Sequence, residues 1–449
     1  MARQPNITVG IMDRRREVAG RLDGDFFGEG CGPVSGRFSA RVTGGEIALM
    51  DHTYREICRS PSIGLRASED ALPRQAFTLF HVTIGDRFHW EREEDQAFRG
   101  HLILQTSGSE TMAAINEVPL EDYLESVIAS EMNDAAPLEF LKAHAILSRS
   151  WLLAALGRKK SPRQPVRSAE GTRVGRTDEE TIRWYDREDH DLFDVCADDH
   201  CQRYQGITRI ASGQAGEAVR RTCGRVMTYR GEVCDARYSK ACGGITEEFD
   251  TAWDDRRVPY LASVSDAAVP HPTVETEAES SRWILSEPEA YCSTGDESLL
   301  EKILPGFDRE TKGFFRWKAE YPRKELEEIL YEKSGLDFGV LKEIVPLRRG
   351  PSGRIFRLRI VGSKRSVIVG KELEIRRWLS RSHLYSSAFV VTVEHDLRGE
   401  PERFVFQGAG WGHGVGLCQI GAAVMAARGL SAEEILGHYF RGIEIRKIY

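Results

Sequence analysis

The sequence contains no run of about 20 apolar residues, the length that a helix needs to cross a bilayer, so we expect no membrane span. Its first 30 residues lack a basic segment followed by an apolar one, so no signal peptide is recognised. Lysine and arginine form no dense stripe, and the formal net charge of −7 argues against nucleic acid as a partner. The sequence also lacks internal repeats and low-complexity tracts, which argues against a repeat architecture.

Cysteine is too scarce for a disulfide-stabilised scaffold, with nine residues among 449, and the number is odd. We therefore expect a mixture of buried thiols and ligands, and these cysteines do not indicate the redox compartment. Hydrophobic residues make up 41% of the chain and charged residues 29%, so we expect a sizeable core and no global disorder. The length allows two or three domains, or one large composite domain.

Strand patterns dominate the beginning of the chain. Residues 6–110 are predicted to form strands separated by glycine-rich breaks, such as the hairpin signal Gly44-Gly45. After Pro119, apolar residues at helical spacing predict a helix, with one face made by Leu120, Leu124, Val127 and Ile128. The fold class is therefore α+β, with a strand-rich start and a few helices.

Helices and strands alternate in the remainder of the chain. A second, alanine-rich helix is predicted from Pro137 to about Leu156, with Gly157 as its C-terminal cap. A further helix is predicted at 324–333, and Ser431 with Glu434 forms a capping-box signature before a final helix. Additional strands are predicted at 204–211, 225–238, 354–361 and 365–369, of which the last two form a hairpin.

These patterns divide the chain into four consecutive segments. They are a β-rich part (1–115), a region with the first two helices and a candidate zinc loop (116–264), a secondary inserted region (265–335), and a C-terminal β part with a glycine-rich block and the last helices (336–449). Within the second segment, residues 158–190 are charged and poor in apolar residues, which is typical of a surface insertion.

Glu131 lies eleven residues after Leu120 and therefore extends the apolar stripe of the first helix by one turn. A carboxylate on the buried face of a helix is unfavourable unless it is paired or protonated, and burial favours the neutral form. A carboxylic acid that stays protonated is what glycosidic cleavage needs to protonate the leaving oxygen. On spacing alone, a helix that ends here explains Glu131 at least as well, either with the carboxylate in solvent or with it capping a neighbouring helix.

The segment around Glu131 resembles a known family. Residues 118–124 read VPLEDYL, residues 130–132 read SEM and residues 141–143 read LKA. Together with two later blocks they resemble the SpoIID/LytB family, whose members act on bacterial peptidoglycan, from about residue 7 to residue 449 with two apparent insertions. In that family the glutamate of the SEM motif is the catalytic acid/base of a lytic transglycosylase, and the resemblance implies this role for Glu131.

The first of the later blocks is GHGVGLCQIGA at residues 412–422, which resembles the GHGVGMSQYGA block of the family. Its glycines permit a tight backbone and the close approach of a ligand. Trp411, His413 and Gln419 are its candidate sugar-binding residues. The alternative is a sharp turn packed on the core, with His413 satisfied by the backbone.

The second block is YSKACGGIT at residues 238–246, which resembles the YHS-x-x-GG-x-T block of the family. Tyr238 and the later Tyr260 are candidates for a sugar-binding groove, because aromatic rings stack on sugar faces. Core or hairpin packing explains each tyrosine at least as well. We expect the N-terminal strands, the Glu131 helix and the glycine-rich block to converge on one groove, to which this block adds Tyr238 and two more glycines.

The chain departs from the family pattern at several positions. These are Asn133 in place of proline, Lys240 in the YHS block, Cys418 in place of serine and Ile420 in place of tyrosine. None of them removes the Glu131 carboxylate, but the last two put in doubt any role of the hydroxyl groups that they replace.

Four potential metal ligands lie within twelve residues: His190, Cys196, His200 and Cys201. Thiolates and imidazoles suit zinc, although the spacing is not that of a CxxC pair. Some SpoIID relatives carry a Cys/His zinc site just before the same Cys-Gln-x-Tyr segment, so the resemblance implies a structural zinc that fastens this loop near the groove. Incidental residues of a surface loop are the alternative, and nothing in the sequence demands a catalytic zinc.

The resemblance implies non-hydrolytic cleavage of the β-1,4 bond between N-acetylmuramic acid and N-acetylglucosamine, leaving 1,6-anhydro ends. A non-catalytic peptidoglycan-binding protein that enhances a cell-wall amidase is the alternative. A zinc amidase or peptidase is disfavoured, because the sequence has no HExxH-type ligand pair. By the same resemblance we expect the protein in the cell envelope or outside the cytoplasm, although no export signal is seen.

Overall fold

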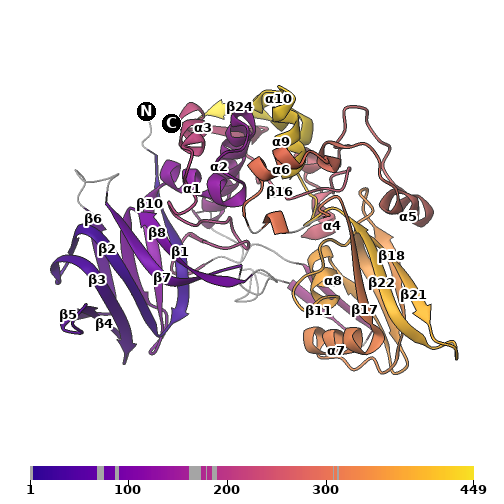
Figure 1. The fold of residues 1–449 in the computed structure, drawn as a ribbon, viewed down its shortest axis with the longest axis horizontal. Coiled ribbons are helices and arrows are strands. Elements are labelled where there is room, and N and C mark those ends of the chain that lie inside the picture. The colour runs from indigo at the N-terminus through magenta and orange to yellow at the C-terminus, as the bar shows by residue number, and fades with distance from the viewer. Residues whose placement is uncertain are drawn as a thin grey trace. The chain divides into compact units, whose positions relative to one another are not determined.

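The computed structural model describes residues 4–67, 75–85, 91–160, 173–177, 179–184, 190–306, 308–310 and 313–449. The chain forms two compact units (Figure 1), each built from segments that are not adjacent in the sequence. Unit 1 comprises Met1–Arg149, Asp189–Val226 and Lys447–Tyr449, and unit 2 comprises Ser150–Glu188 and Met227–Arg446. The four consecutive segments proposed from the sequence stay a prediction, because the compact units interleave along the chain.

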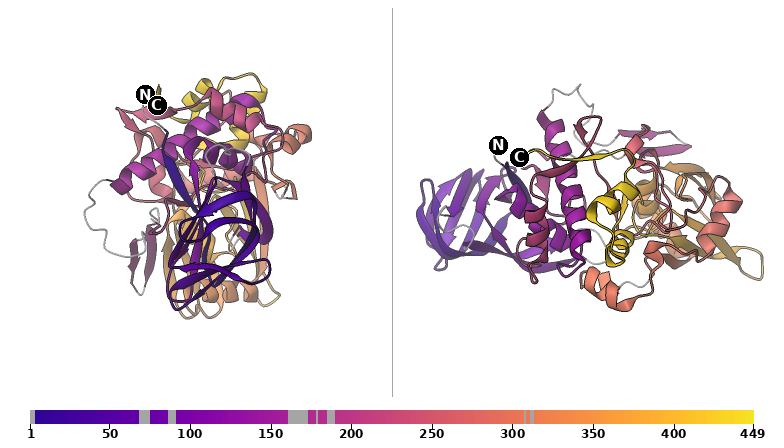
Figure 2. Two further views of the ribbon diagram at one scale, coloured as in Figure 1. Left: turned by 90° about the vertical axis from the view of Figure 1, so that its left-hand side faces the viewer. Right: turned by 90° about the horizontal axis from the view of Figure 1, so that it is seen from above.

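Unit 1 is built around one large sheet, most of which is drawn in indigo and purple in Figure 1. The left view of Figure 2 shows the strands of this sheet crossing one another at the front. Its strands run in the order β13-β1-β10-β9-β6-β2-β3-β4-β5, and β7 pairs with β2 and β8. They are β1 (Asn6–Arg15), β2 (Glu17–Gly28), β3 (Gly32–Thr43), β4 (Glu46–Asp51), β5 (Glu56–Ser60), β6 (Ser62–Ala67), β7 (Ala76–Ile84), β8 (Arg92–Arg99), β9 (His101–Thr106), β10 (Met112–Pro119) and β13 (Val195–Cys196).

The strands of this sheet follow the alternation expected of a sheet with one buried face. In β2, for example, Val18, Leu22 and Phe26 are buried, whereas their neighbours in sequence are mostly exposed. The predicted strand-rich start is confirmed, and Gly44-Gly45 joins β3 to β4 with a positive φ at both residues, as tight hairpins require. A disulfide between Cys31 and Cys58, which the sequence did not reveal, joins the β2–β3 turn to β5.

Three helices belong wholly or partly to unit 1. They are α1 (Leu120–Glu131), α2 (Leu138–Lys160, of which unit 1 takes the part up to Arg149) and α3 (Gln214–Arg221). Helix α1 follows β10 directly after Pro119, and its predicted apolar face is buried. The predicted end of α2 is wrong, because Gly157 lies inside the helix; an isolated glycine costs only about 1 kcal/mol there and does not stop the helix.

The strand predicted at 204–211 is also wrong, because the segment contains no strand and residues 206–209 form turns. Gly206 has a φ of +58° and lies so close to β8 that a Cβ there would stand 2.0 Å from the carbonyl oxygen of Ala97. The N–H of Ile207 donates to the same carbonyl oxygen at 2.8 Å. The tight approach to β8 bends the chain where the apolar alternation alone favours a strand.

Unit 2 contains several smaller sheets. They are β11-β12-β20-β19-β18, β17-β22-β21, β15-β14-β24 and β16-β23. Their strands are β11 (Arg173–Arg176), β12 (Glu180–Trp184), β14 (Arg225–Tyr229), β15 (Glu232–Val233), β16 (Tyr238–Ser239), β17 (Arg316–Pro322), β18 (Leu341–Arg349), β19 (Ile355–Gly362), β20 (Ser366–Gly370), β21 (Phe389–His395), β22 (Pro401–Ala409), β23 (Leu417–Cys418) and β24 (Glu444–Lys447). The predicted hairpin is confirmed as β19 and β20, whereas the predicted strand at 225–238 is broken into β14, β15 and the first residue of β16.

The helices of unit 2 confirm the helical signals of the sequence. They are α4 (Phe249–Ala252), α5 (Glu277–Leu285), α6 (Glu297–Ile303), α7 (Arg323–Ser334), α8 (Glu372–Trp378), α9 (Gln419–Ala427) and α10 (Ala432–Tyr439). Helix α10 begins with the predicted capping box of Ser431 and Glu434. Strands β17–β22 and helices α7 and α8 contribute to one apolar core, which includes Trp317, Phe389 and Trp378. The fold is thus of the predicted α+β class.

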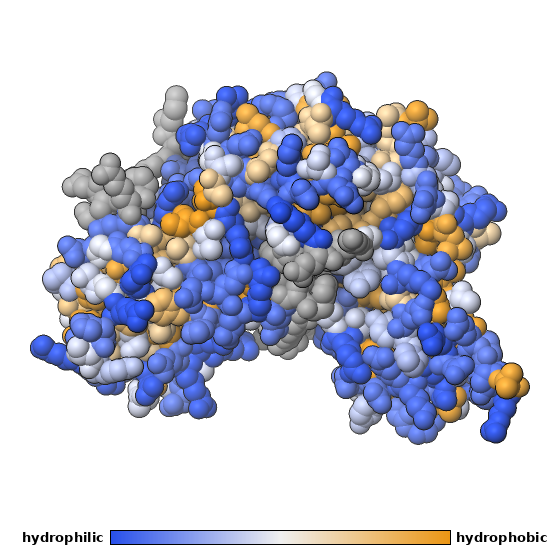
Figure 3. All heavy atoms as spheres, viewed as in Figure 1, coloured by the Kyte–Doolittle hydropathy of each residue, from blue (hydrophilic) through white to orange (hydrophobic). Residues whose placement is uncertain are grey.

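In the face shown in Figure 3, hydrophilic side chains cover most of the area and hydrophobic groups are scattered. Among the described residues, no helix combines the length and the apolar character that a membrane span requires.

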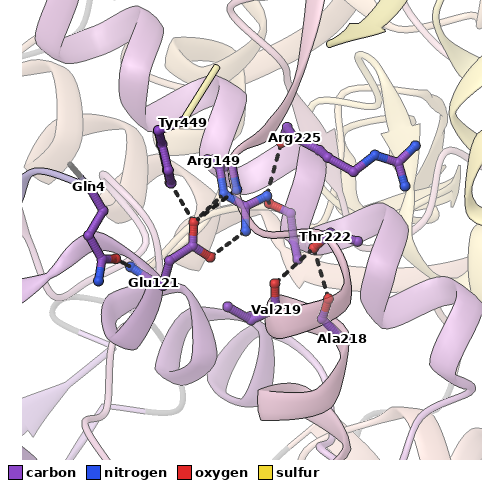
Figure 4. Close-up of polar contacts among 10 residues, drawn as sticks. Gln4, Glu121, Arg149, Ala218, Val219, Thr222, Arg225 and Tyr449 are labelled. Carbon is purple, nitrogen blue, oxygen red and sulfur yellow. Dashed lines mark hydrogen bonds and ion pairs between the residues drawn. The ribbon is translucent and has the colours of Figure 1, made fainter. Parts of the chain in front are cut away.

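A buried ion pair joins the helices of unit 1 (Figure 4). The guanidinium of Arg149 on α2 donates from Nε and Nη2 to the two carboxylate oxygens of Glu121 on α1, at 2.9 and 2.6 Å. The Arg149 side chain is completely buried, and its Nη1 donates to the carbonyl oxygen of Arg225 at 2.9 Å. The Glu121 carboxylate also accepts hydrogen bonds from the Gly224 N–H and the Tyr449 hydroxyl. One pair thereby fixes α1, α2, the end of α3 and the C-terminus.

Replacing Arg149 with alanine should destabilise unit 1 strongly. The substitution leaves the Glu121 carboxylate without its cation, and removal of one partner from a buried pair typically costs about 3–5 kcal/mol. We expect a lower urea midpoint in unfolding followed by circular dichroism. The matched control is Arg221→Ala, because Arg221 pairs with Glu217 on the surface, where ion pairs contribute little. An unchanged midpoint for Arg149→Ala would show that the pair does not hold the helices together.

Candidate functional site

Glu131 is the last residue of α1, and only 7% of its surface is exposed. Its Oε1 accepts a hydrogen bond from the backbone N–H of Arg203 at 3.1 Å. The carboxylate is therefore neither in solvent nor capping a helix terminus through this contact. The backbone of a segment 72 residues away orients it, as a group that must present a proton in a fixed direction requires.

That segment, residues 201–205, lies along α1 and is tied to it at several points. The hydroxyl of Tyr123 donates to the side-chain oxygen of Gln202 at 3.1 Å, and the N–H of Gln205 donates to the Ser130 hydroxyl at 3.1 Å. The ring of Tyr204 stacks on that of Tyr123, with centroids 5.1 Å apart. Contacts on both sides of Arg203 therefore keep its N–H directed at Glu131.

The four predicted zinc ligands converge just before this segment. One potential ligand atom from each of His190, Cys196, His200 and Cys201 lies within 4.8 Å of the others. The Cys201 sulfur is 3.4 Å from Nε2 of His190 and 3.5 Å from Nδ1 of His200, and the Cys196 sulfur is 3.7 Å from the latter atom. A tetrahedral zinc with ordinary bond lengths separates sulfur and nitrogen ligands by about 3.6 Å. The residues therefore fit a zinc ion, whose presence stays a prediction.

The chemistry of the cluster favours a thiolate. Burial alone would raise the pKa of the Cys201 thiol, but hydrogen bonds from the neighbouring thiol and imidazoles lower it well below its usual range. Cys201 stands two residues before Arg203, and Cys196 belongs to β13, which pairs with β1 of the large sheet. A cross-link here would connect the sheet to the backbone that hydrogen-bonds Glu131.

The glycine-rich block lies in unit 2, whereas Glu131 lies in unit 1, so the expected common groove stays a prediction. Within unit 2 the close approach that these glycines allow is made by Arg354, which is completely buried. Its guanidinium donates to the carbonyl oxygens of Gly412 and Cys242, and a Cβ on Gly414 would stand 2.4 Å from it. The sequence contains no pattern that singles out Arg354, because its partners are distant in the chain.

His413 is held as a neutral imidazole. Burial and three positive charges lower its pKa well below its usual range; the charges belong to Arg237, Arg354 and Arg376. Its Nδ1 accepts the N–H of Val415 at 3.0 Å, so the ring proton resides on Nε2. The ring packs edge-on against Trp253, 4.6 Å between centroids. The backbone thus satisfies this nitrogen, and the sugar-binding role of His413 stays a prediction.

The other candidate sugar-binding residues lie in the same unit. The ring of Trp411 stacks on Tyr385, 4.3 Å between centroids, and Gln419 is buried at the start of α9. Tyr238 is half-buried in β16, which pairs with β23 of the glycine-rich block. The hydroxyl of Tyr260 accepts the N–H of Asp235 at 3.0 Å, and burial raises its pKa to about 12. Structural contacts therefore hold Trp411 and Tyr260, and the sugar-binding roles of all four stay predictions.

Glu247 is a buried acid that sequence reasoning missed. Burial raises its pKa to about 7, although hydroxyl and N–H donors from Ser352, Thr251 and Glu248 oppose this rise. Its own N–H donates to the carbonyl oxygen of Gly414 at 2.9 Å. Glu247 is therefore a structural support of the glycine-rich block. The only sequence signal is its place directly after the YSKACGGIT block.

Two segments of the chain match known family models. Residues 108–229, which include Glu131 and the Cys/His cluster, match the model described as Stage II sporulation protein (SpoIID). Residues 247–416 match a model described as a domain of unknown function.

Curated relatives resemble most of the chain at low identity. A Stage II sporulation protein D from Bacillus amyloliquefaciens is 24% identical over 333 residues, which is 74% of this chain and 75% of that protein. The protein of the same name from Bacillus subtilis (strain 168) is 23% identical over 334 residues, 74% of this chain and 76% of that protein. A Bacillus subtilis protein named Amidase enhancer is 23% identical over 334 residues, 71% of this chain and 39% of that protein.

The free energy of unfolding should fall as the pH rises through the titration of Glu247. Its folded pKa of about 7 lies above the value of about 4.3 expected for an unfolded glutamate, so the native chain binds more protons between these pH values. The stabilisation that protonated Glu247 contributes is therefore complete below about pH 4 and lost above about pH 7. We expect Glu247→Gln, which has no proton to lose, to reduce the decline in urea midpoint from pH 5 to pH 8. The control is Glu275→Gln, because Glu275 is exposed, and this variant should show the same decline in urea midpoint as the wild type. An equal decline in all three proteins would contradict the role of Glu247 in the pH dependence.

Proposed function

Since the chain belongs to the SpoIID/LytB family, we propose that it acts on the bacterial cell wall by cleaving the glycan strands of peptidoglycan. The family assignment itself supports a role at the cell wall. The cleavage activity is our proposal, and the observation that carries it is Glu131, a buried carboxyl group at the end of α1 that a backbone N–H holds in place.

In the proposed reaction Glu131 serves first as general acid and then as general base. It protonates the glycosidic oxygen while the bond from this oxygen to the C1 atom of N-acetylmuramic acid breaks. The C6 hydroxyl of the same sugar then bonds to C1, and Glu131 takes up the proton of that hydroxyl. The products are a free N-acetylglucosamine 4-hydroxyl and a 1,6-anhydro end. One carboxyl group suffices because the nucleophile is internal, in contrast to glycosidases that use two.

We also propose that His190, Cys196, His200 and Cys201 bind one structural zinc ion. Four protein ligands leave no open position for substrate or water, which is typical of structural sites. When bound, the ion would supply a cross-link between β13 and residues 201–205. The task of this segment in catalysis is to direct the Arg203 N–H at Glu131.

The disulfide supports a location outside the cytoplasm. Cys31 and Cys58 form a bond that persists in oxidising compartments and is rare in reducing ones. This agrees with the cell envelope or extracytoplasmic location that the family suggests.

The relative named Amidase enhancer favours a second candidate function. In this alternative the chain binds glycan strands and stimulates a cell-wall amidase without cleaving glycan itself. Turnover by the purified protein distinguishes the two functions.

Glu131→Gln should abolish glycan cleavage and leave the fold intact. Glutamine keeps the shape of the side chain but cannot transfer a proton, and loss of a general acid lowers rates by about 10²- to 10⁴-fold. Mass spectrometry of peptidoglycan digested by the pure protein would quantify the 1,6-anhydro ends. Glu125→Gln is the matched control, because it makes the same change on the same helix at a carboxylate that pairs with Arg99.

Two results would contradict the proposed cleavage. Wild-type turnover by the Glu131→Gln protein would exclude this residue as the acid. Absence of 1,6-anhydro ends from the wild-type digest, with stimulation of an added cell-wall amidase, would favour the second candidate function.

The double variant Cys196→Ser/Cys201→Ser should lose one zinc ion per chain and unfold at a lower urea concentration, because metal binding contributes directly to folding. Elemental analysis of metal-replete protein gives the first quantity and circular dichroism the second. Cys234→Ser is the control, since Cys234 is a buried thiol outside the cluster. Equal zinc contents in the double variant and the wild type would refute this site.

A further inference from the structure

Unit 2 contains a second group of potential metal ligands, all of them buried: Cys242, Asp266, Cys292 and Cys418. One ligand atom from each residue lies within 4.8 Å of the others. No sequence pattern indicates this group, because its members are spread over 177 positions and follow no ligand spacing. Their convergence is a property of the fold.

Four separate segments bring these residues together. Cys242 follows β16, and Cys418 ends β23, the strand that pairs in parallel with β16. Asp266 follows Ser265, which forms an isolated bridge with Ile245. Cys292 lies in a 3-10 helix, η2 (Tyr291–Ser293), and its N–H donates to Oδ2 of Asp266 at 3.0 Å.

The spacing of the group fits a single tetrahedral ion. The sulfur atoms of Cys242 and Cys292 are 3.7 Å apart. Two thiolates on one tetrahedral zinc, with bonds of about 2.3 Å, are separated by about 3.8 Å. An iron–sulfur cluster would hold its cysteine sulfurs farther apart, because several irons and sulfides lie between them. Three thiols and one carboxylate are also a donor set that zinc accepts.

The hydrogen bonds to the sulfur atoms resemble those that surround metal ligands. The N–H of Cys242 donates to the sulfur of Cys418 at 3.2 Å, and the N–H of Gly244 donates to the sulfur of Cys242 at 3.4 Å. Such outer contacts orient ligands and stabilise their ionised forms. Gly244 has a φ of +105°, a conformation that glycine adopts readily and that directs its N–H back to the sulfur.

The carboxylate is oriented in the same way. The hydroxyl of Tyr439 on α10 donates to Oδ1 of Asp266 at 2.5 Å. Gly421 on α9 leaves the room that this carboxylate occupies, because a Cβ there would stand 2.3 Å from Oδ1. Both C-terminal helices therefore contact the Asp266 carboxylate, α10 through a hydrogen bond and α9 through a glycine that leaves room for it.

We propose that Cys242, Asp266, Cys292 and Cys418 bind one zinc ion as a second structural site. Cys242 and Cys418 lie just outside the two ends of residues 247–416, the segment that matches the domain of unknown function, and the other two ligands lie within it. The ion fastens the base of this segment to the two strands that flank it. The site depends on a thiol at position 418, where the family resemblance indicates serine.

The test measures zinc in the full-length protein with the first cluster removed. Protein carrying Cys196→Ser and Cys201→Ser should retain one zinc ion per chain, and X-ray absorption at the zinc edge should show three sulfur ligands and one lighter ligand. Adding Cys292→Ser should remove this ion, whereas adding Cys234→Ser should not, because Cys234 is buried outside both clusters. Replacing zinc with cobalt in the double variant should give the intense visible bands of a tetrahedral thiolate site.

The absorption measurements require no change at the second site, so a folding defect of Cys292→Ser does not affect them. Absence of zinc from the folded Cys196→Ser/Cys201→Ser protein would overturn the proposal. So would peptide mapping that finds a disulfide between Cys242 and Cys292 in protein isolated without reductant. Because none of these readouts depends on glycan cleavage, an inactive protein leaves the outcome unchanged.

Discussion

The buried pair of Glu121 and Arg149 is the constraint on which the geometry of unit 1 depends. Both charges leave water on folding, which is unfavourable unless every polar atom finds a partner. The carboxylate meets this condition with the guanidinium, the Gly224 N–H and the Tyr449 hydroxyl. Because these partners come from α2, from the chain after α3 and from the C-terminus, α1 can satisfy its buried charge in only one position. The pair therefore specifies where α1 lies.

The position of α1 in turn determines where Glu131 lies, ten residues after Glu121 and nearly three helical turns along the same helix. Residues 201–205 hold α1 independently, through hydrogen bonds with Tyr123 near its start and with Ser130 and Glu131 at its far end. A helix held at both ends by backbone and buried side chains keeps its last carboxyl group in a fixed direction. Proton transfer requires such a direction more than it requires a large number of contacts.

The sequence predicted the parts of this arrangement that rest on local patterns. The helical spacing of α1, the alternation of β2 and the capping box of α10 each follow from residues within a few positions of one another. The Cys/His cluster was found for the same reason, because its four residues lie within twelve positions. The apolar stripe alone left the role of Glu131 open, and the resemblance of the surrounding SEM motif to the SpoIID/LytB family indicated it as the candidate acid.

Long-range contacts could not be predicted in this way. The partner of Glu121 is 28 residues away, and the carbonyl oxygens that bind Arg354 are 58 and 112 residues away. The strand predicted at 204–211 failed because its alternation gave no sign that Gly206 packs against the Ala97 carbonyl. The helix end predicted at Gly157 failed because glycine weakens a helix without ending it.

The nine cysteines differ in their surroundings in the folded chain. Their odd number and low density excluded a disulfide scaffold, yet one disulfide is present, and it supports an oxidising compartment. In such a compartment, two thiols that lie close together are expected to form a disulfide unless their sulfur atoms are bound to something else, such as a metal ion. Five of the remaining seven cysteines lie in the two clusters, and the sulfurs of Cys242 and Cys292 are only 3.7 Å apart. The two zinc ions that we propose would account for this distribution, because thiolates bound to an ion are ligands instead of free nucleophiles and because each ion would replace a cross-link that a disulfide would otherwise make.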